Sequence, residues 1–382
     1  MDRSRTLLLN WIYYYPVGHA VEAFAAAAEY FAANPNLEVN LLLNAKTPVE
    51  LSQYCSWVKK TYAIDVEEIA VNGQTASCLT DLPREWDYVV SSERLLDNPS
   101  SYSEALIRCH NVIDDITTAR IWRGIRGDVG QGNQAVPEYI PFTAFKMEPP
   151  LQARVWARQF SQYDPLCAVL LGGSSSEQIY PHVDWWIRLF KEMRHAFPAI
   201  HFLIMGSTDP SKGRSTTHGY STEELKTLFD VTSNASNCYN VGLPNQLALL
   251  EQADFLVSPH TGFAFLAPSV GTPWLSISGV RWPDPTFARM PFYAVLPKCP
   301  EYPCYLNMLP ECRDRLERGI RTLCMGDDLF ERINEVVAGA RLLLDPAFDL
   351  FAAAKKYEFL AQQKGVNIER LYTLDILKTH KI

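Results

Sequence analysis

The sequence contains no long hydrophobic run and no cluster of basic residues, and each absence excludes a class of protein. A helix that spans a bilayer needs roughly 18 consecutive apolar residues, and no stretch of the chain approaches that length. Affinity for a nucleic-acid backbone depends on clustered Lys and Arg, whereas this chain carries a net charge of −8 and no basic run. We therefore expect neither a transmembrane segment nor a nucleic-acid partner.

The sequence also lacks a secretory signal and the cysteine pattern of a secreted protein. The short apolar run near the N-terminus leads into tyrosines rather than into a small-residue cleavage site. There are nine cysteines, an odd number, and the five outside one cluster are scattered through both halves of the chain. This distribution favours reduced thiols over a disulfide framework. The sequence predicts a cytoplasmic protein.

Short apolar runs alternate with helical patterns along both halves of the chain. In the N-terminal half, strands are predicted at residues 6–12, 39–43, 88–90 and 111–113, and an Ala-rich helix at 20–33. In the C-terminal half, strands are predicted at 167–171, 201–205, 255–257 and 274–277, with helices between them. This alternation predicts an α/β protein whose parallel sheets carry helices on both faces.

The length of 382 residues is sufficient for two domains with separate cores. We place the boundary in the weakly patterned, Pro-bearing stretch that ends near residue 165. The predicted domains are residues 1–160 and 161–349, and the second includes a Cys-rich segment at 299–324. A helical segment at 350–382 follows. Two such domains imply a cleft between them.

The stretch at residues 254–279 is the most informative one. An apolar run precedes the polar loop Ser258 to Gly262, and a helical pattern then leads to Gly271. In an open α/β sheet, the loop after a strand opens into the ligand crevice, and the N-terminus of the next helix attracts anions. Thr261 and Gly262 would present a hydroxyl and an unshielded backbone to a phosphate. An ordinary βαβ turn is the alternative interpretation.

A second polar loop follows the predicted strand at 167–171. It contains Gly173 and three consecutive serines, Ser174, Ser175 and Ser176. If it converges with the Thr261 loop at the sheet edge, hydroxyls and backbone N–H groups could hold a diphosphate without a bound cation. His260 would contact a phosphate oxygen or a sugar, or would only cap the helix behind it.

Several motifs together resemble those of one family, the heptosyltransferase family of GT-B glycosyltransferases. The motifs that carry the resemblance are Gly172 to Ser176 followed by Tyr180-Pro181 and Trp185-Trp186, Asn240-Val241-Gly242, Ser258 to Gly262, and Gly271-Thr272-Pro273. The resemblance covers most of the chain and is weakest at residues 116–163. It implies the GT-B fold, in which two Rossmann-like parallel-sheet domains face each other across a cleft. It also implies sugar transfer from a nucleotide-diphosphate donor.

The sequence departs from the family at positions that carry chemistry. Where the family has a catalytic Asp after the first-loop Gly, this chain has His19, and its Asp before Thr-Gly is His260. The family's His three positions after that Gly is Phe265, and its donor-phosphate Lys is Gln178 or has no counterpart. The fold and the mode of donor binding therefore carry over better than the identity of the donor.

His19 is the candidate general base. Inverting transfer needs a group that deprotonates the acceptor hydroxyl, and His19 follows Gly18 where a helix is predicted to begin. The positive end of a helix dipole favours a neutral imidazole, which can accept a proton. A His after Gly in this loop is also similar to the base of other GT-B glycosyltransferases. Glu22 is the reserve base, and a helix-capping His without a catalytic role is the alternative.

Four cysteines, Cys299, Cys304, Cys312 and Cys324, lie in one segment. Four thiolates can hold a structural Zn or Fe ion, although this segment lacks the close Cys-x2-Cys pair of zinc ribbons. The resemblance supports a metal here, because many heptosyltransferase-like proteins carry a Cys cluster in this region and some bind a metal. Two disulfides and four free thiols are the alternatives.

Together these features predict an inverting, heptosyltransferase-like enzyme that needs no cofactor for catalysis. Its donor would be a nucleotide sugar, and its acceptor a glycan, a protein or a small molecule. Two alternatives remain open at this point. One is a GT-B epimerase or hydrolase that acts on the nucleotide sugar itself, and the other is a non-catalytic nucleotide-sugar-binding subunit.

Overall fold

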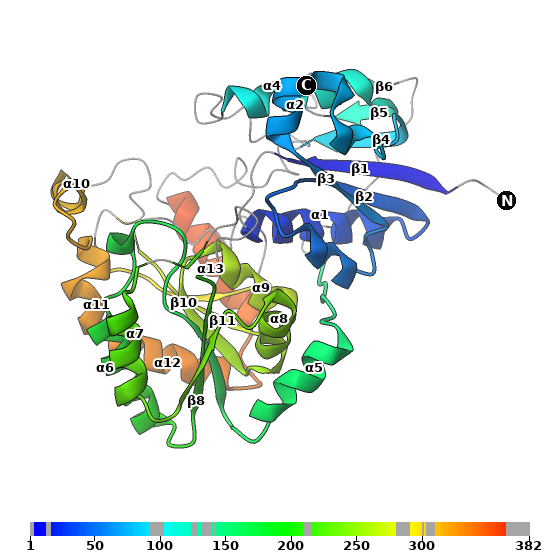
Figure 1. Cartoon of the computed structure of the whole chain (residues 1–382). Coiled ribbons are helices and arrows are strands. Elements are labelled where there is room, and N and C mark those ends of the chain that lie inside the picture. The colour runs from blue at the N-terminus through cyan, green and yellow to red at the C-terminus, as the bar shows by residue number, and fades with distance from the viewer. Residues whose placement is uncertain are drawn as a thin grey trace. The chain divides into compact units, whose positions relative to one another are not determined.

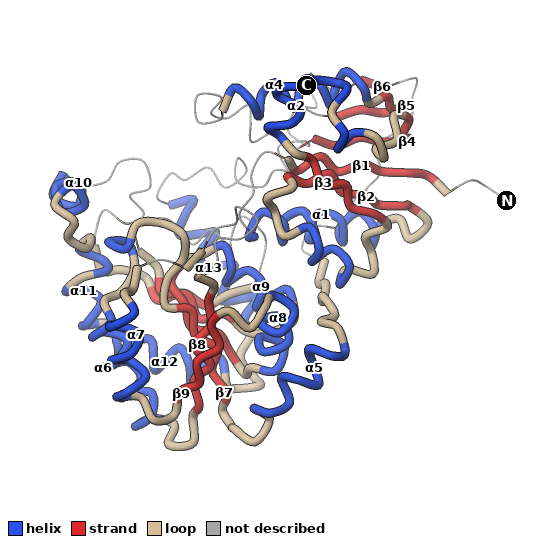
Figure 2. Tube along the Cα trace, viewed as in Figure 1, coloured by secondary structure: helices blue, strands red, loops and turns tan. Residues whose placement is uncertain are grey.

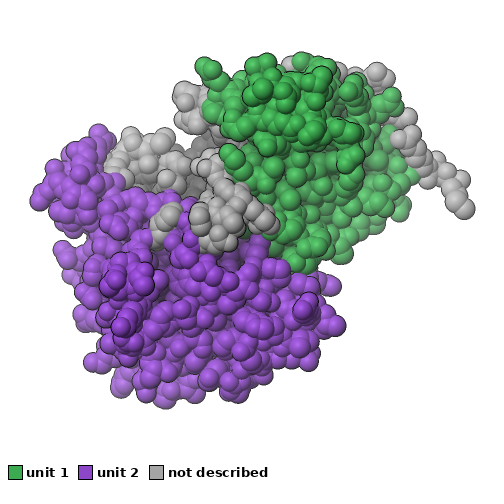
Figure 3. Space-filling view, in the orientation of Figure 1, with its two compact units in different colours: residues 1–147, 212–214, 367–382 green, residues 148–211, 215–366 purple. Residues whose placement is uncertain are grey.

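The computed structural model describes residues 4–12, 17–91, 103–123, 129–130, 140, 143–208, 216–217, 219–279, 291–299, 302 and 310–363. The described residues form two compact units, one within residues 4–147 and the other within residues 148–363. Figure 1 labels their helices and strands, and Figure 3 colours the two units separately. Each unit is an α/β structure with its own sheet, which confirms the predicted fold class.

The first unit begins with a strand and a long helix, as its sequence pattern predicts. Its strands are β1 (Arg5–Trp11), β2 (Leu37–Asn44), β3 (Lys60–Ile64), β4 (Glu85–Ser91), β5 (Thr118–Arg123) and β6 (Val129–Gly130). Its α-helices are α1 (Val17–Ala33), α2 (Val66–Asn72) and α4 (Glu104–Ile116). The strand β5 lies in the stretch where the sequence pattern is weak.

The predicted strand at residues 111–113 is wrong, because these residues belong to α4. The Ser103 side chain caps the helix by accepting a hydrogen bond from the Leu106 N–H. Within α4 the buried residues recur at the three- and four-residue spacing of one helical face: Leu106, Cys109, His110, Ile113 and Ile116. A short apolar run alone cannot distinguish a buried helical turn from a strand.

The sheet of the first unit has the strand order β3-β2-β1-β4-β5-β6. All neighbouring pairs are parallel except β5 and β6, which are antiparallel. The chain therefore builds outward from β1 in one direction with β2 and β3, and then in the other direction with β4. The helix α1 follows β1, so its N-terminus lies at the edge where β1 and β4 end.

The second unit contains more elements and a fully parallel sheet. Its strands are β7 (Leu166–Leu170), β8 (His201–Gly206), β9 (Ala235–Tyr239), β10 (Phe255–Pro259), β11 (Trp274–Ile277) and β12 (Tyr293–Val295). Its α-helices are α5 (Leu151–Ala157), α6 (Val183–Ala196), α7 (Thr222–Val231), α8 (Leu243–Gln252), α9 (Leu266–Ser269), α10 (Pro310–Glu317), α11 (Asp327–Glu331), α12 (Ile333–Leu343) and α13 (Leu350–Gln363).

The sheet of the second unit has the order β12-β11-β10-β7-β8-β9. Figure 2 shows helices on both sides of these strands, so both faces of the sheet are buried, as parallel sheets require. The predicted C-terminal helical segment is a helix over Leu350–Gln363, and residues 364–382 of it lie outside the described residues. Among the described helices, none has the length and apolar character needed to cross a membrane.

The core between this sheet and helices α6 and α12 is rich in aromatic residues. Trp185 and Trp186 of α6 are fully buried in it. The Trp185 indole donates a hydrogen bond to the Leu329 carbonyl at 2.9 Å, and the Trp186 indole donates to the Tyr220 hydroxyl at 2.9 Å. A buried indole N–H needs such a partner. The core therefore holds α6, and with it the loop that precedes α6, in a fixed place.

In the first unit, His110 makes stability depend on pH. Its side chain is buried in α4, and in the described part of the chain neither ring nitrogen has a hydrogen-bond partner. Burial lowers its pKa from 6.5 to about 3. As the pH falls below 6.5, His110 therefore becomes protonated in the unfolded chain, whereas in the folded chain it stays neutral until about pH 3. The free energy of unfolding is therefore unaffected by protonation of this residue above pH 6.5 and decreases as the pH falls from 6.5 to about 3.

We expect acidification from pH 7 to pH 4.5 to lower the free energy of unfolding by roughly 2–3 kcal/mol more in the wild type than in His110→Leu. The reason is that leucine fills the buried site without titrating. Urea unfolding at the two pH values measures the difference. An equal loss of unfolding free energy in both proteins would show that burial does not lower the pKa of His110.

Candidate functional site

The order of the strands in the second unit reverses between β7 and β10. From β7 the chain adds β8 and β9 on one side, and it then places β10, β11 and β12 on the other side. Val169 of β7 pairs with Val257 of β10 in parallel, so the loops after these strands leave the same edge of the sheet. Ligands of open α/β sheets bind at such a reversal point. Both loops that we expect to hold a diphosphate lie there.

The loop after β10 is closed by Thr261. The Thr261 hydroxyl accepts a hydrogen bond from the Ala264 N–H at 3.3 Å. It thereby caps a 3-10 helix, η8 (Gly262–Phe265), which continues into α9. Gly271 follows with a φ of 89°, a conformation that favours glycine and ends the helix. A hydroxyl that accepts one hydrogen bond still has a hydrogen to donate, so Thr261 keeps a donor for an anion.

Gly173 allows the loop after β7 to meet Thr261. A β-carbon at position 173 would lie 2.8 Å from the Tyr180 hydroxyl oxygen and 3.0 Å from the Thr261 Cβ. Side chains do not tolerate such distances in a packed structure. The glycine is therefore needed for the close approach of two loops that are far apart in the sequence.

The three serines lie on the exposed part of the same loop. The Ser175 N–H donates to the Tyr180 hydroxyl at 3.1 Å, and the Ser176 hydroxyl donates to the Gln178 side-chain oxygen. The Gln178 amide in turn donates to the Glu177 carboxylate at 3.1 Å. The loop carries one carboxylate and no basic residue. An anion bound by this loop would therefore be held by hydroxyl and backbone N–H groups.

His260 is half-buried at the end of β10. Its ring stands edge-on to the ring of Phe265, with 6.1 Å between centroids. Phe265 is buried and packs against Trp274 at 5.5 Å. The apolar side of His260 is thus supported from within the unit, which restricts the directions in which its ring nitrogens can point.

In the first unit, His19 lies in the first turn of α1, after β1. Its side chain is 22% exposed, and its Nδ1 lies 2.9 Å from Oε2 of Glu22, which is 10% exposed. A carboxylate oxygen can only accept a hydrogen bond, so this contact fits a ring whose Nδ1 donates to Glu22. Glu22, predicted as a reserve base, therefore lies in direct contact with His19.

Tyr180 and Arg321 also contribute to the loop after β7, and neither was predicted as a binding residue. The Arg321 Nε donates to the Tyr180 carbonyl at 2.9 Å, and the Thr322 N–H donates to the Gln178 carbonyl at 3.1 Å. Two residues from the C-terminal third of the chain therefore hold the end of the loop at residues 172–180, which we call the serine loop. No local pattern signals this contact, because the partners are far apart in sequence.

The described cysteines of the Cys-rich segment do not form a metal site. Cys299, Cys312 and Cys324 form no disulfide, and Cys304 lies outside the described residues. Across the described ranges, no group of three His, Cys, Asp or Glu side chains is placed to hold a metal ion. The Cys324 thiol is buried and lies 3.4 Å from the Thr322 hydroxyl. A site with all four cysteines stays a prediction.

Comparison with known proteins relates the chain to others by its fold. No protein-family model and no curated protein sequence matches it. A glycosyl transferase family 9 structure from Veillonella parvula is similar with a TM-score of 0.57 and 10% identity, over 90% of this chain and 98% of that one. The ADP-heptose LPS heptosyltransferase II of E. coli is similar with a TM-score of 0.54 and 11% identity, over 88% and 99%. The chain thus shares the α/β fold of these two transferase structures.

Proposed function

We propose that this protein is a glycosyltransferase that uses a nucleotide-diphosphate sugar as donor. The observation that carries the proposal is the meeting of Gly173 and Thr261 at the reversal point of the second sheet. The names of the two similar structures, a family 9 glycosyl transferase and an ADP-heptose LPS heptosyltransferase, support it. The proposed acceptor is a hydroxyl-bearing glycan, protein or small molecule.

The donor diphosphate would bind between the two loops. Ser174, Ser175 and Ser176 offer exposed hydroxyls, and Thr261 and Gly262 offer a hydroxyl hydrogen and a helix N-terminus. These groups would also stabilise the charge that develops on the leaving diphosphate. Gln178, whose amide is bonded within the loop, would position Ser176, and His260 would contact the phosphate or the transferred sugar.

His19 would act as the general base of an inverting transfer. In the tautomer that Glu22 stabilises, Nε2 can take the proton of the acceptor hydroxyl while that oxygen attacks the anomeric carbon. The bond to the diphosphate breaks on the opposite face, which inverts the configuration. Glu22 would stabilise the imidazolium that forms, as a carboxylate does beside the His of a catalytic triad.

A thermal-shift panel of nucleoside diphosphates and nucleotide sugars tests the donor site. A ligand at about 100 times its Kd should stabilise the wild type by about 2.7 kcal/mol. We expect Thr261→Arg to lose this stabilisation, because position 261 is buried between the two loops and the larger side chain occupies the site. The measurement is the ligand-dependent change in melting temperature.

Two further variants make the result specific. Thr227→Arg adds the same side chain to an exposed position of α7 in the same unit, so it should keep the full ligand shift. Ser174→Glu replaces an exposed serine, so it should fold normally and yet repel a diphosphate. If no nucleotide stabilises the wild type at saturating concentration, the proposed function is wrong.

A further inference from the structure

The Tyr180 hydroxyl lies at the junction of the two loops of the candidate site. Its oxygen would be 2.8 Å from a β-carbon at position 173, next to Thr261. Tyr180 is only 3% exposed, so its ring is anchored in the unit and its hydroxyl group projects to this junction. A β-carbon at Gly219 would lie 3.5 Å from the Tyr180 ring, which shows how closely the ring is enclosed.

The hydrogen of this hydroxyl is not used in a hydrogen bond within the described residues. Its oxygen accepts the Ser175 N–H at 3.1 Å. A tyrosine hydroxyl can both accept and donate, but within the described ranges the Tyr180 hydroxyl donates to no acceptor. A buried donor without an acceptor is costly. An oxygen-rich ligand between the two loops would remove that cost.

The neighbouring Tyr220 shows what a purely structural hydroxyl looks like in this unit. Its oxygen accepts from the Trp186 indole at 2.9 Å, and its hydrogen has two backbone carbonyls within reach, Pro181 at 2.7 Å and Leu171 at 3.0 Å. Every hydrogen-bonding function of Tyr220 is satisfied within the protein. Tyr180 differs because its hydroxyl hydrogen has no acceptor within the described residues.

Arg321 fixes the other end of Tyr180. Its Nε donates to the Tyr180 carbonyl at 2.9 Å, and its side chain is half-buried. This bond holds the backbone at the end of the serine loop, so the Tyr180 side chain enters the junction from a fixed point. Arg321 therefore acts as a positioning residue for Tyr180.

We propose that the Tyr180 hydroxyl binds the nucleotide-sugar substrate. It donates a hydrogen bond to a phosphate oxygen of a nucleoside diphosphate held between Gly173 and Thr261. This inference rests on the proposed function, because it adds a further protein group to the proposed diphosphate site. It also accounts for a loop that lacks a basic residue. A neutral donor that is buried and fixed supplies directed hydrogen bonding where the loop supplies no charge.

The test compares diphosphate and nucleoside binding in the variant Tyr180→Phe. The panel of ADP, GDP, UDP and CDP identifies the nucleotide that the wild type binds, and calorimetry then gives its Kd and that of the matching nucleoside. We expect Tyr180→Phe to bind the diphosphate about 10- to 100-fold more weakly, the effect of losing a hydrogen bond to a charged group. Binding of the nucleoside should stay unchanged.

Tyr220→Phe is the matched control. It removes a hydroxyl from the same neighbourhood, so we expect a lower melting temperature and no selective loss of diphosphate affinity. Ser175 is exposed, so water can replace the Tyr180 hydroxyl as the acceptor of its N–H, and Tyr180→Phe should fold. Arg321→Met should weaken diphosphate binding in the wild-type background and have no further effect in Tyr180→Phe.

The outcomes distinguish the role of Tyr180 from the proposed function. If the wild type binds a nucleoside diphosphate and Tyr180→Phe binds it equally well, the role of Tyr180 is refuted and the proposed function stands. An equal loss for nucleoside and diphosphate would make the Tyr180 hydroxyl a structural group only. If the wild type binds no nucleotide, both proposals fail together.

Discussion

Replacing His19 by alanine is expected to lower kcat by about 10²- to 10⁴-fold, the usual contribution of a general base. The structure places the His19 Nδ1 at 2.9 Å from the Glu22 carboxylate, the contact on which the proposed role of His19 as base rests. The rate of nucleoside diphosphate release from the donor, with water or an acceptor as nucleophile, measures the effect. The Kd of the nucleotide should not change, because the proposed donor loops belong to the second unit.

Glu22→Gln is the companion variant for this experiment. The amide can still accept the Nδ1 hydrogen, but it cannot stabilise the imidazolium as a carboxylate does. We therefore expect a smaller loss of kcat than in His19→Ala, and little additional loss in the double variant, because both changes remove one function. Full activity in His19→Ala would refute its role as base. Nucleotide binding without any turnover in the wild type would instead favour the non-catalytic binding subunit.

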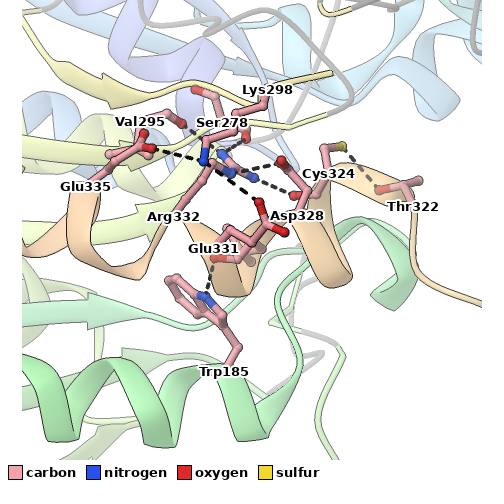
Figure 4. Close-up of polar contacts among 11 residues, drawn as sticks. Trp185, Ser278, Val295, Lys298, Thr322, Cys324, Asp328, Glu331, Arg332 and Glu335 are labelled. Atoms are coloured by element: carbon pink, nitrogen blue, oxygen red, sulfur yellow. Dashed lines mark hydrogen bonds and ion pairs between the residues drawn. The ribbon is translucent and has the colours of Figure 1, made fainter. Parts of the chain in front are cut away.

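Loss of the Arg332 side chain is expected to give the largest effect on stability. Figure 4 shows its guanidinium among backbone carbonyls from separate parts of the second unit. The Nη1 donates to the carbonyls of Ser278 and Val295, each at 3.3 Å, and the Nη2 donates to the carbonyl of Cys324 at 2.5 Å. Arg332 thus ties the ends of β11 and β12 to the 3-10 helix η10 (Leu323–Met325).

The charge of Arg332 is fully buried, and the Asp328 carboxylate forms an ion pair with it. Its Nε lies 2.9 Å from the Asp328 Oδ2, whose side chain is 20% exposed. This contact is an ion pair without the alignment of a hydrogen bond. Burial lowers the pKa of the Arg332 guanidinium, and the Asp328 carboxylate acts against that shift. The buried cation is therefore stabilised by Asp328 and by the three carbonyls together.

We expect Arg332→Met to lower the free energy of unfolding by about 3–5 kcal/mol, the cost of breaking a buried pair by removing one partner. The variant leaves three carbonyls without their donor and the Asp328 carboxylate without its cationic partner, although methionine fills much of the volume. Urea unfolding followed by tryptophan fluorescence measures the change, because Trp185 bonds to Leu329 in the adjoining helix.

Lys298→Met is the control for the loss of a positive charge. Lys298 lies 3.7 Å from Glu335 and 3.9 Å from Glu331, but its side chain is 55% exposed. Exposed pairs contribute about 1 kcal/mol or less, so this variant should remain close to the wild type. Equal effects of the two substitutions would contradict the structural role of Arg332.

Local patterns predict the elements of the candidate site well. The strand at β10, the short helix after Thr261 and the glycine stop at Gly271 are all present. Each is encoded by residues that are neighbours in the sequence, through apolar runs, caps and turn residues. The predicted strand at residues 111–113 fails for the same reason, because a run of three residues is too short to show the helical period of α4.

By itself, the sequence determined that this chain is an α/β protein with polar loops after its strands, because periodicity and turn chemistry are local properties. Only the tertiary structure decided which loops meet. Gly173 touches Thr261 because β7 and β10 are neighbours in the strand order, and Arg321 reaches Tyr180 from far along the chain. Such contacts depend on how the sheet is assembled, which no local spacing specifies. Thr261 and Tyr180, which we propose bind the diphosphate, lie at these long-range contacts.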